Sequence, residues 1–525
     1  MEAKTATKIE GKHAVTATKP RPPVVVVMGH VDHGKTTLLD YIRKANVAAR
    51  EAGGITQAVG SYEIEHGSRK ITFIDTPGHE AFAAMRSRGA SIADLAILVV
   101  AADEGVKPQT KEVIQVLNDT KTPFIVALNK IDKLSDRGAG AGLDKAKGDL
   151  ATAGVLLEGF GGQVSWHGIS AKTGEGVSEL LDLVLLVADL EHLTYDAGAP
   201  ATGFVLEARR DPRRGIEATI IVKDGVLRRG DEIRSRDAEG KTIAGKVKIL
   251  ENFLGKAAAE LPASSPAVVI GFEALPRAGE LFTTGKDAVA TLEAGAHMAP
   301  RNATKKGGAS HAGAGAGAGA GVAVAGAKKV QILHLLLKAS DAGSLEALER
   351  VLGGIKPPEG KLVHFVDSSV GDVTDGDVKH AAATGATIIA FKSRVEKGAQ
   401  TLAEAQRIMV ITSNIVYDLE KAVREFLEGK AGPAMAGKLE VLAVFSQDKL
   451  EKQLVGGRVT EGIFREKATC SIVRADGSNA PLLARVINLR EKKSEITQAE
   501  AGKEIGVLLS APVAVQVGDV LAIRL

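Results

Sequence analysis

The sequence is short of cysteine, aromatic residues and long apolar runs, and each shortage excludes a class of protein. The 525 residues include one cysteine, Cys470, so the chain can form neither an internal disulfide nor a cysteine-based metal cluster. Aromatic residues make up 3% of the chain, so its cores must be built mainly from Val, Ile, Leu and Ala. No run reaches the roughly 18 uninterrupted apolar residues that suggest a membrane-spanning helix. The sequence therefore predicts no membrane protein.

The charge and the first residues narrow the class further. The formal net charge of +3 is too small to indicate nucleic-acid binding by itself. Residues 1–20 lack the apolar core of a signal peptide and contain two acidic residues and no arginine, unlike a transit peptide. We therefore expect a cytoplasmic protein with a flexible leader over residues 1–20. The length predicts about three to five domains.

One stretch near the N-terminus has the pattern of a phosphate-binding loop. Residues 24–28 are continuously apolar and mostly β-branched, as in a strand of a parallel sheet. The sequence GHVDHGKT then fits G-x-x-x-x-G-K-[ST], and a helical pattern begins at Thr37. Strand, glycine loop and helix in this order predict a site for a nucleoside triphosphate. The candidate binding residues are Gly29, His30, Val31, Asp32, His33, Gly34, Lys35, Thr36 and Thr37.

Physical chemistry assigns roles within this loop. Gly29 and Gly34 permit backbone angles that direct successive N–H groups at phosphate oxygens. The following helix contributes the positive end of its dipole. Lys35 supplies a positive charge for the β- and γ-phosphates, and the Thr36 hydroxyl is placed to ligate Mg²⁺.

A second motif follows a strand expected over residues 70–74. Strand and helix patterns alternate through this part of the chain, which predicts a mainly parallel sheet with helices on both faces. Asp75 ends its strand on the phosphate side, where a carboxylate can hold Mg²⁺ opposite Thr36. The turn that follows, Thr76, Pro77, Gly78 and His79, is placed to sense the γ-phosphate.

A third motif selects the base. Asn129, Lys130, Ile131 and Asp132 follow the apolar run of residues 123–128. The Asp132 carboxylate can accept two hydrogen bonds from the edge of guanine, and adenine has no such pair of donors. Ser170, Ala171 and Lys172, after another expected strand, add a backbone N–H near the base oxygen. Together these residues predict GTP over ATP.

The rest of the chain predicts further units. We expect a GTPase domain over residues 21–196, an antiparallel barrel over 200–286, and a linker over 287–327 that contains a Gly/Ala-rich tether. A small α/β/α domain over 328–412, a connecting helix over 413–433 and a C-terminal barrel over 437–525 follow. In this plan Ser344 caps a helix over residues 344–352, and Gly456 with Gly457 forms a turn of the last barrel. The predicted fold class is multidomain α/β plus β.

The motifs resemble those of a known family. The segments GHVDHGKT, AGGITQ (52–57), DTPGHEAF (75–82) and NKID resemble the GTPase domain of bacterial translation initiation factor two, and the resemblance extends over residues 21–525. It implies that Gly54 and Thr56 belong to a switch and that Thr56 closes over Mg²⁺. It implies that His79 positions the attacking water and that Asp32 helps to hold a monovalent cation. Ala58 stands where the family has histidine.

The resemblance also implies that the last barrel binds the acceptor end of formylmethionyl initiator tRNA. The residues matched are Arg490, Lys492, Gly502, Glu504 and Ile505. Ile505 replaces a cysteine of the family's amino-acid pocket. Arg490 and Lys492 have the rival interpretation of ordinary surface charges. The basic loop of residues 209–215 is either a solvated hairpin tip or a contact to ribosomal RNA.

Three hypotheses follow. The leading one is a monomeric, ribosome-stimulated GTPase that uses Mg²⁺, places initiator tRNA on the small ribosomal subunit and promotes joining of the large subunit, with other initiation factors as further partners. The second is another ribosome-dependent GTPase, such as a specialised elongation factor or an archaeal-type subunit-joining factor. The third is a scaffold that binds GTP without hydrolysing it.

Overall fold

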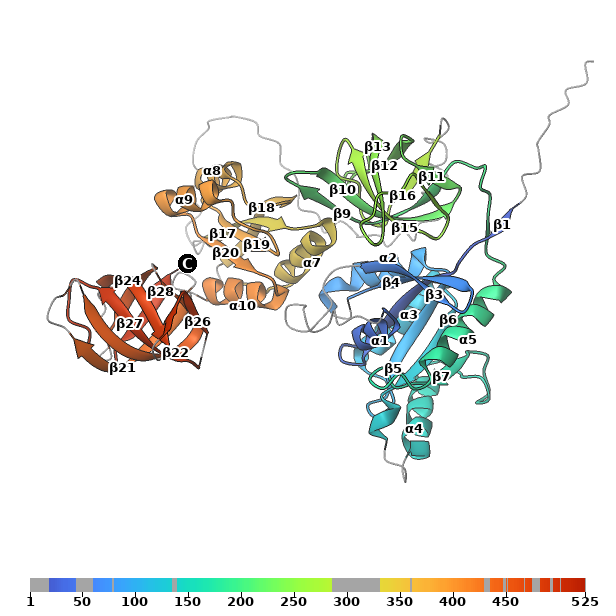
Figure 1. The fold of residues 1–525 in the computed structure, drawn as a ribbon, viewed down its shortest axis with the longest axis horizontal. Coiled ribbons are helices and arrows are strands. Elements are labelled where there is room, and N and C mark those ends of the chain that lie inside the picture. The colour runs from blue at the N-terminus through green and yellow to red at the C-terminus, as the bar shows by residue number, and fades with distance from the viewer. Residues whose placement is uncertain are drawn as a thin grey trace, which may run out of the picture.

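The described part of the chain forms four units (Figure 1). A computed structural model describes residues 18–43, 60–77, 80–134, 139–285, 331–358, 361–428, 435–446, 450, 452–466, 468–474, 482–491, 494–500 and 502–524. We call the units the N-terminal α/β unit (19–195), the first barrel (202–284), the second α/β unit (331–427) and the second barrel (435–524). The predicted Gly/Ala-rich tether lies outside the described residues.

The N-terminal α/β unit is built on a six-stranded sheet with the order β3-β4-β2-β5-β6-β7. Neighbouring strands are parallel except β3 and β4, which form an antiparallel pair. The strands are β2 (Val24–Gly29), β3 (Gly60–His66), β4 (Arg69–Asp75), β5 (Leu95–Ala101), β6 (Phe124–Asn129) and β7 (Trp166–Gly168). All six residues of β2 are buried, as its continuous apolar run predicted.

Helices cover both faces of this sheet. They are α1 (Lys35–Arg43), α2 (Ala83–Ile92), α3 (Pro108–Thr120), α4 (Ala139–Thr152) and α5 (Val177–Leu190), with the short 3₁₀ segments η2 (Glu80–Phe82) and η3 (Ile131–Lys133). Val24, Val26 and Met28 point to the face covered by α2, α3 and α4. Val25 and Val27 point to the face covered by α1 and α5. Because side chains alternate along a strand, one apolar run supplies both cores.

Two expectations at the edges of this unit are wrong. Lys19 and Pro20, placed in the flexible leader, form β1 (Lys19–Pro20) and pair with β8 (Thr194–Tyr195). The glycine-containing, weakly periodic sequence of residues 45–61 predicts a mobile segment, but Gly60 and Ser61 begin β3. In both cases the local composition does not indicate a strand. The strand forms because the residues pair with another strand, β8 for Lys19 and Pro20 and β4 for Gly60 and Ser61.

The first barrel is a closed antiparallel sheet with the order β10-β15-β13-β12-β16-β9. Its strands are β9 (Thr202–Asp211), β10 (Gly215–Asp224), β12 (Glu232–Arg236), β13 (Thr242–Asn252), β15 (Pro266–Phe272) and β16 (Leu281–Thr284). A two-stranded ribbon, β11 (Val226–Arg228) with β14 (Glu260–Pro262), lies beside it. Closure leaves this sheet with no exposed edge.

A buried ion cluster joins the first barrel to the N-terminal α/β unit. The Asp94 carboxylate accepts hydrogen bonds from both Nη atoms of Arg21, at 2.6 and 2.8 Å, and from the Val24 N–H at 2.9 Å. The barrel contributes Lys223, whose Nζ lies 2.5 Å from the same carboxylate. Ser264 Oγ donates to the Pro22 carbonyl at 2.6 Å. The two units therefore share polar groups as well as apolar contacts.

The second α/β unit has a parallel sheet of order β18-β17-β19-β20. Its elements are β17 (Gln331–Ala339), α7 (Ala342–Gly353), β18 (Lys361–Val370), α8 (Asp375–Thr384), β19 (Thr387–Phe391), α9 (Lys397–Gln406), β20 (Val410–Ser413) and α10 (Val416–Leu427). One core lies under α7 and α10, and another lies under α8 and α9.

Two details of this unit correct the sequence interpretation. Asp341 caps α7, and its carboxylate accepts the Ser344 N–H at 2.7 Å, so Ser344 is not the cap. The expected connecting helix is α10, which begins at Val416 and buries Val416, Leu419, Val423 and Leu427 in the core. These residues recur at spacings of three and four, which is the spacing of one helix face.

The second barrel closes because β21 pairs with both β22 and β28. Its strands are β21 (Met435–Ser446), β22 (Gln453–Arg465), β23 (Thr469–Val473), β24 (Leu482–Glu491), β25 (Ser494–Ile496), β26 (Gln498–Glu500), β27 (Glu504–Ser510) and β28 (Val520–Arg524). Gly456 and Gly457 lie inside β22, so the turn predicted there is wrong. Gly518, with a φ of 91°, lies in the turn before β28.

Candidate functional site

The loop between β2 and α1 has the backbone of a phosphate cradle. Gly29 and Gly34 have φ angles of 147° and 89°, which residues with a Cβ resist. A Cβ on Gly29 would lie 2.3 Å from the Val99 oxygen, and one on Gly34 would lie 2.2 Å from Asn129 Nδ2. Asp32, at the middle of the loop, has a φ of 62°. Both glycines are therefore required by close approach as well as by conformation.

Lys35 lies at the start of α1, with 6% of its surface exposed. Its Nζ donates to the His30 carbonyl at 2.6 Å, across the loop. Burial lowers the pKa of Lys35 to about 8, and the nearby Asp75 carboxylate opposes this effect. A buried ammonium with so little compensating charge is well suited to a bound anion.

The two loop histidines are neutral at pH 7. Burial lowers the pKa of His33 to about 4, and the adjacent His30 adds to the effect. Burial also lowers the pKa of His30. His33 Nδ1 accepts the Ala101 N–H at 3.3 Å, so its ring anchors the loop to β5. His33 thus has a structural role beside its place in the phosphate-binding pattern.

Asn129 joins the phosphate loop to the predicted base-binding segment. It lies at the end of β6 with 2% of its surface exposed. Its Nδ2 donates to the His33 carbonyl at 2.8 Å, and its Oδ1 accepts the Ala171 N–H at 2.9 Å. One side chain therefore fixes the distance between two loops more than 90 residues apart in the sequence.

The base-binding candidates lie together at the same edge of the sheet. Ser170 Oγ donates to Asp132 Oδ1 at 2.6 Å, which orients the exposed carboxylate. Lys130 has a φ of 67°, and its Nζ pairs with Glu104 at 2.9 Å. Ile131 begins η3, and Lys172 is exposed beyond Ala171. The structure thus brings together the two segments that the sequence placed at the base.

The strand β4 delivers Asp75 to the loop. Asp75 lies opposite Val27 of β2 in the parallel register and is 4% exposed. Thr76 Oγ1 donates to the Val27 carbonyl at 3.1 Å, which fixes the start of the turn at Pro77. Gly78, His79, Gly54 and Thr56 lie outside the described residues.

Two residues at this edge were missed by the sequence analysis. Arg86 of α2 is fully buried, donates to the Pro77 carbonyl at 3.5 Å and pairs with Glu112 of α3 at 2.6 Å. Gln109 of α3 accepts the Val31 N–H of the loop at 3.1 Å. Neither belongs to a motif; a basic residue on an otherwise apolar helix face was the available signal for Arg86.

The residues present fit a magnesium–nucleotide ligand. Thr36, in the first turn of α1, and Asp75, at the end of β4, supply hydroxyl and carboxylate oxygens at the same edge. Mg²⁺ prefers such hard oxygen ligands and completes its shell with phosphate oxygens and water. The glycines let the loop lie close to Val99 and Asn129, so it is held beside these ligands.

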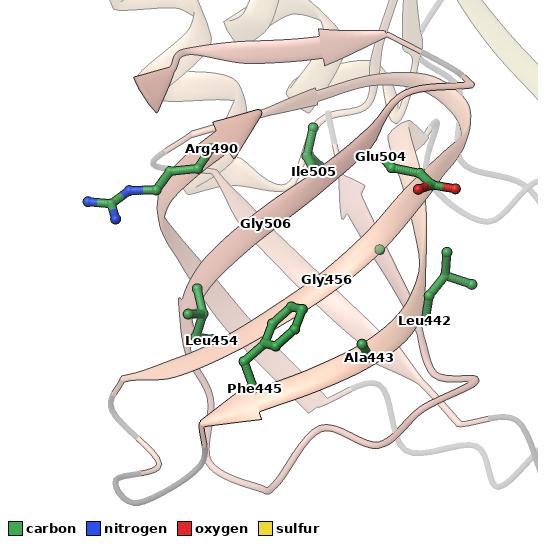
Figure 2. Close-up of a pocket in the computed structure, with 10 residues that line it drawn as sticks. Leu442, Ala443, Phe445, Leu454, Gly456, Arg490, Glu504, Ile505 and Gly506 are labelled. Carbon is green, nitrogen blue, oxygen red and sulfur yellow. The ribbon is translucent and has the colours of Figure 1, made fainter. Parts of the chain in front are cut away.

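A second candidate site is a hollow of about 540 Å³ on the second barrel (Figure 2). Three of the predicted tRNA-binding residues line it together: Arg490, Glu504 and Ile505. Gly502 is not among its lining residues, and Lys492 lies outside the described residues. The sequence analysis missed the apolar part of the lining, which consists of Leu442, Ala443, Phe445, Leu454 and the glycines Gly456, Gly457 and Gly506.

This hollow combines an apolar floor with charged sides. Phe445 is 67% exposed, and Figure 2 shows it below the hollow with Arg490 and Glu504 on opposite sides. Glu504 pairs with Arg458 at 2.6 Å, and Arg490 pairs with Glu495 at 2.9 Å. A ligand with an apolar group and a polar or anionic neighbour suits such a lining.

The basic loop of the first barrel is partly neutralised. Arg209 and Arg214 both pair with Glu217, which is 3% exposed, and Arg214 also pairs with Glu251 at 2.8 Å. Two of its arginines therefore hold the hairpin together. This arrangement leaves both earlier interpretations of the loop open.

Three family models match successive parts of the chain. Residues 21–189 match the model of the elongation factor Tu GTP binding domain, residues 200–285 match elongation factor G domain 2, and residues 322–424 match translation-initiation factor 2. In the part of the chain that the structure describes, no helix is long and apolar enough to cross a membrane.

Similar proteins of known name cover nearly the whole chain. Translation initiation factor IF-2 of Rubrobacter xylanophilus is 37% identical over 505 residues, which is 95% of this chain and 71% of that protein. The factor of the same name from Chloroflexus aurantiacus is 36% identical, over 96% of this chain and 66% of its own length. The crystal structure of GDP-bound aIF5B from Aeropyrum pernix is 26% identical, with a TM-score of 0.46, over 96% of this chain and 92% of that one. The identity and coverage of the bacterial relatives establish that the chain belongs to the translation initiation factor IF-2 family.

Proposed function

We propose that this protein is a ribosome-stimulated GTPase that places formylmethionyl initiator tRNA on the small ribosomal subunit and promotes joining of the large subunit. The observation that carries the nucleotide part is the bridge made by Asn129, which holds the phosphate loop and the base-binding segment in one rigid arrangement. The tRNA part rests on the hollow of the second barrel and on the family.

In this proposal GTP binds at the carboxyl edge of the first sheet. The backbone N–H groups between Gly29 and Thr37 hold the phosphates, and Lys35 contributes its charge. Asp132 accepts two hydrogen bonds from guanine, with Ser170 orienting its carboxylate at 2.6 Å. A base without those donors cannot make these two hydrogen bonds to Asp132, which is the source of specificity.

Mg²⁺ belongs to the bound nucleotide, and Thr36, Thr56 and Asp75 are the residues that would hold it. Its chemical contribution is to neutralise charge on the phosphates as it develops. We propose Asp32 as the residue beside a monovalent cation. Gly54 and Thr56 form the proposed switch, and Thr76, Pro77 and Gly78 form the turn that responds to the γ-phosphate.

Hydrolysis requires an oriented water, and we assign that task to His79. It follows the turn that Arg86 and Thr76 anchor at Pro77. Contact with the ribosome would complete the arrangement, so intrinsic turnover is slow. A scaffold that never hydrolyses GTP has no use for a histidine at this place.

We propose that the hollow on the second barrel receives the aminoacyl end of the tRNA. Phe445 and Leu442 offer apolar surface for a methionyl side chain, and Arg490 lies beside them for the terminal phosphates. Ile505 is among the lining residues, and its side chain is 3% exposed and belongs to the apolar core of the barrel behind the hollow. The predicted domain boundaries remain part of this proposal.

The decisive experiment measures ribosome-dependent GTP hydrolysis together with protection of initiator tRNA. Phosphate release should rise strongly with both ribosomal subunits present. The protein should slow hydrolysis of the ester bond of formylmethionyl-tRNA and leave methionyl-tRNA unprotected. Equal protection of the two would favour an archaeal-type factor or an elongation factor. Absence of multiple-turnover phosphate release would favour the non-hydrolysing scaffold.

A further inference from the structure

Two histidines face each other on adjacent strands of the second α/β unit. His334 in β17 and His364 in β18 are directly opposite in the parallel register, and the two strands run side by side (Figure 1). Their Nδ1 atoms are 3.4 Å apart, and their rings are nearly perpendicular, at 83°, with centroids 5.4 Å apart. Because the two nitrogens are closer to each other than the ring centres are, both Nδ1 atoms face the space between the rings.

This space is open to solvent. His334 lies two residues before Leu336, which belongs to the core under α8 and α9, so both side chains project from the same face of the sheet. The next pair along the same face, Ile332 and Leu362, is 50% and 52% exposed. His364 is exposed and His334 is half-buried. The histidines therefore lie at the border of the surface that the helices cover, where a small ion can reach them.

The distance between the two nitrogens suits a shared metal ion better than a hydrogen bond. Hydrogen bonds from N–H donors are usually about 2.7–3.2 Å long, and 3.4 Å exceeds that range. In zinc sites, the distance from the metal to a histidine nitrogen is about 2.0–2.1 Å. Two nitrogens 3.4 Å apart then subtend an angle of about 110° at one ion, which is the angle of a tetrahedral site.

We propose that His334 and His364 form a binding site for Zn²⁺. Imidazole nitrogens suit zinc and the neighbouring transition metals, whereas Mg²⁺ prefers oxygen ligands. Among the described residues, no group of three or more His, Cys, Asp or Glu side chains could hold a metal ion, so the protein supplies two ligands here. Water takes the other two positions of the tetrahedron. Such a site exchanges its ion with the solvent.

The ion would tie the edge of the sheet to its neighbour. In the order β18-β17-β19-β20, β18 is the edge strand and has β17 beside it. An ion that binds the closed sheet but not the opened one lowers the opening constant by the factor one plus the ratio of metal concentration to Kd. The stability of this edge therefore depends on Zn²⁺. The site uses neither the nucleotide nor the tRNA candidate site, so it goes beyond the function proposed above.

The first test is calorimetric titration of the full, untagged chain with Zn²⁺, in the presence of excess Mg²⁺ to occupy oxygen sites. Native protein is compared with the double variant His334→Gln, His364→Gln, which keeps polar side chains without imidazole. The double variant should lose one equivalent of bound Zn²⁺. His364→Gln alone should weaken that equivalent at least about tenfold, since loss of a mere supporting group at a metal site already costs roughly 10- to 100-fold.

Matched controls are needed because other histidines can bind Zn²⁺. His66, for example, lies 2.7 Å from an Asp182 oxygen in the N-terminal α/β unit. The difference between native protein and the double variant is therefore decisive, and the total number of ions is not. His380→Gln changes an exposed histidine on α8 of the same unit and should leave the titration unchanged.

The second test is hydrogen exchange of residues 361–370, which form β18. A Zn²⁺ concentration ten times Kd should lower the opening constant about tenfold in the native protein and leave the double variant unchanged. Without metal the two proteins should exchange alike, which shows that the variant folds. Equal Zn²⁺ binding by native protein and the double variant would overturn the site. Binding without protection of β18 would overturn the bridge between the strands. Both results are independent of GTP hydrolysis and tRNA protection.

Discussion

We expect the ion cluster around Asp94 to contribute strongly to the stability of the contact between the first barrel and the N-terminal α/β unit. Side chains of Arg21 and Asp94 are each 8% exposed, and that of Lys223 is 19% exposed. Asp94→Ala removes the shared acceptor and leaves two cations without their carboxylate. Breaking a buried pair in this way costs about 3–5 kcal/mol. At about 1.4 kcal/mol per factor of ten, local opening should rise by roughly 10²- to 10⁴-fold.

Hydrogen exchange of the peptides that cover β2 and β10 is the suitable assay, because a chain with several units does not unfold in one step. Asp189→Ala is the matched control, since its pair with Arg69 is 56% and 44% exposed on the two sides. An exposed pair of this kind contributes at most about 1 kcal/mol. The control should therefore leave exchange in β2 and β10 nearly unchanged.

Replacing the whole cluster with apolar residues shows why Asp94→Ala is destabilising. It separates the cost of leaving buried charges unpaired from the cost of losing the contact itself. The triple variant Arg21→Met, Asp94→Leu, Lys223→Met should be far more stable than Asp94→Ala, because no charge is left buried.

Burial acts to raise the pKa of Asp94, but Arg21 and Lys223 outweigh it and hold the pKa low. The contribution of the cluster is therefore present above the ordinary aspartate pKa of about 3.9 and lost as pH falls through the lowered value. If Asp94→Ala changes opening by less than tenfold, or if the triple variant is equally unstable, this reasoning is wrong.

Three other predictions concern the proposed activity. His79→Ala should reduce ribosome-stimulated phosphate release by about 10²- to 10⁴-fold while GTP affinity is unchanged; a loss of affinity instead would contradict its assignment to the water. Asn129→Ala leaves the His33 carbonyl and the Ala171 N–H without their partner, at about 1–3 kcal/mol each, so fluorescent GTP and GDP should both bind at least about tenfold more weakly. Arg490→Ala should weaken protection of formylmethionyl-tRNA by roughly tenfold, the loss of one charge-assisted hydrogen bond, and leave stimulated GTP hydrolysis intact.

The candidate nucleotide site at the carboxyl edge of the first sheet could be predicted from the sequence, because the motifs that indicate it are local. Strand, glycine loop and helix are contiguous between β2 and α1, and each motif directly follows a strand of a parallel sheet. Parallel strands bring their carboxyl ends to one edge of the sheet. The position of Asp75 and Asn129 beside the loop could therefore be predicted without knowing any side-chain contact. The supports of that edge were not predictable, because Arg86 and Gln109 act through helices whose positions depend on packing.

Contacts between the units could not be predicted from the sequence either. In the sequence, Asp94 is an ordinary acidic residue that follows a helix. Its role in the cluster becomes visible only in the structure, where Lys223 of the first barrel pairs with it. Such pairs form where two folded units meet, and periodicity within either unit carries no information about the other.

The second barrel shows how a local rule can obscure a site. Two consecutive glycines favour a turn when only neighbouring residues are considered. In β22 they serve another purpose, because a Cβ on Gly456 would lie 2.8 Å from Phe445 Cε2 and one on Gly457 would lie 2.5 Å from the Glu440 oxygen. Without side chains at these positions, β21 and Phe445 can approach β22, and the surface beside them remains hollow. A glycine inside a strand often marks such a close approach. The pair that seemed to end a strand is therefore better understood as part of the floor of the candidate tRNA site.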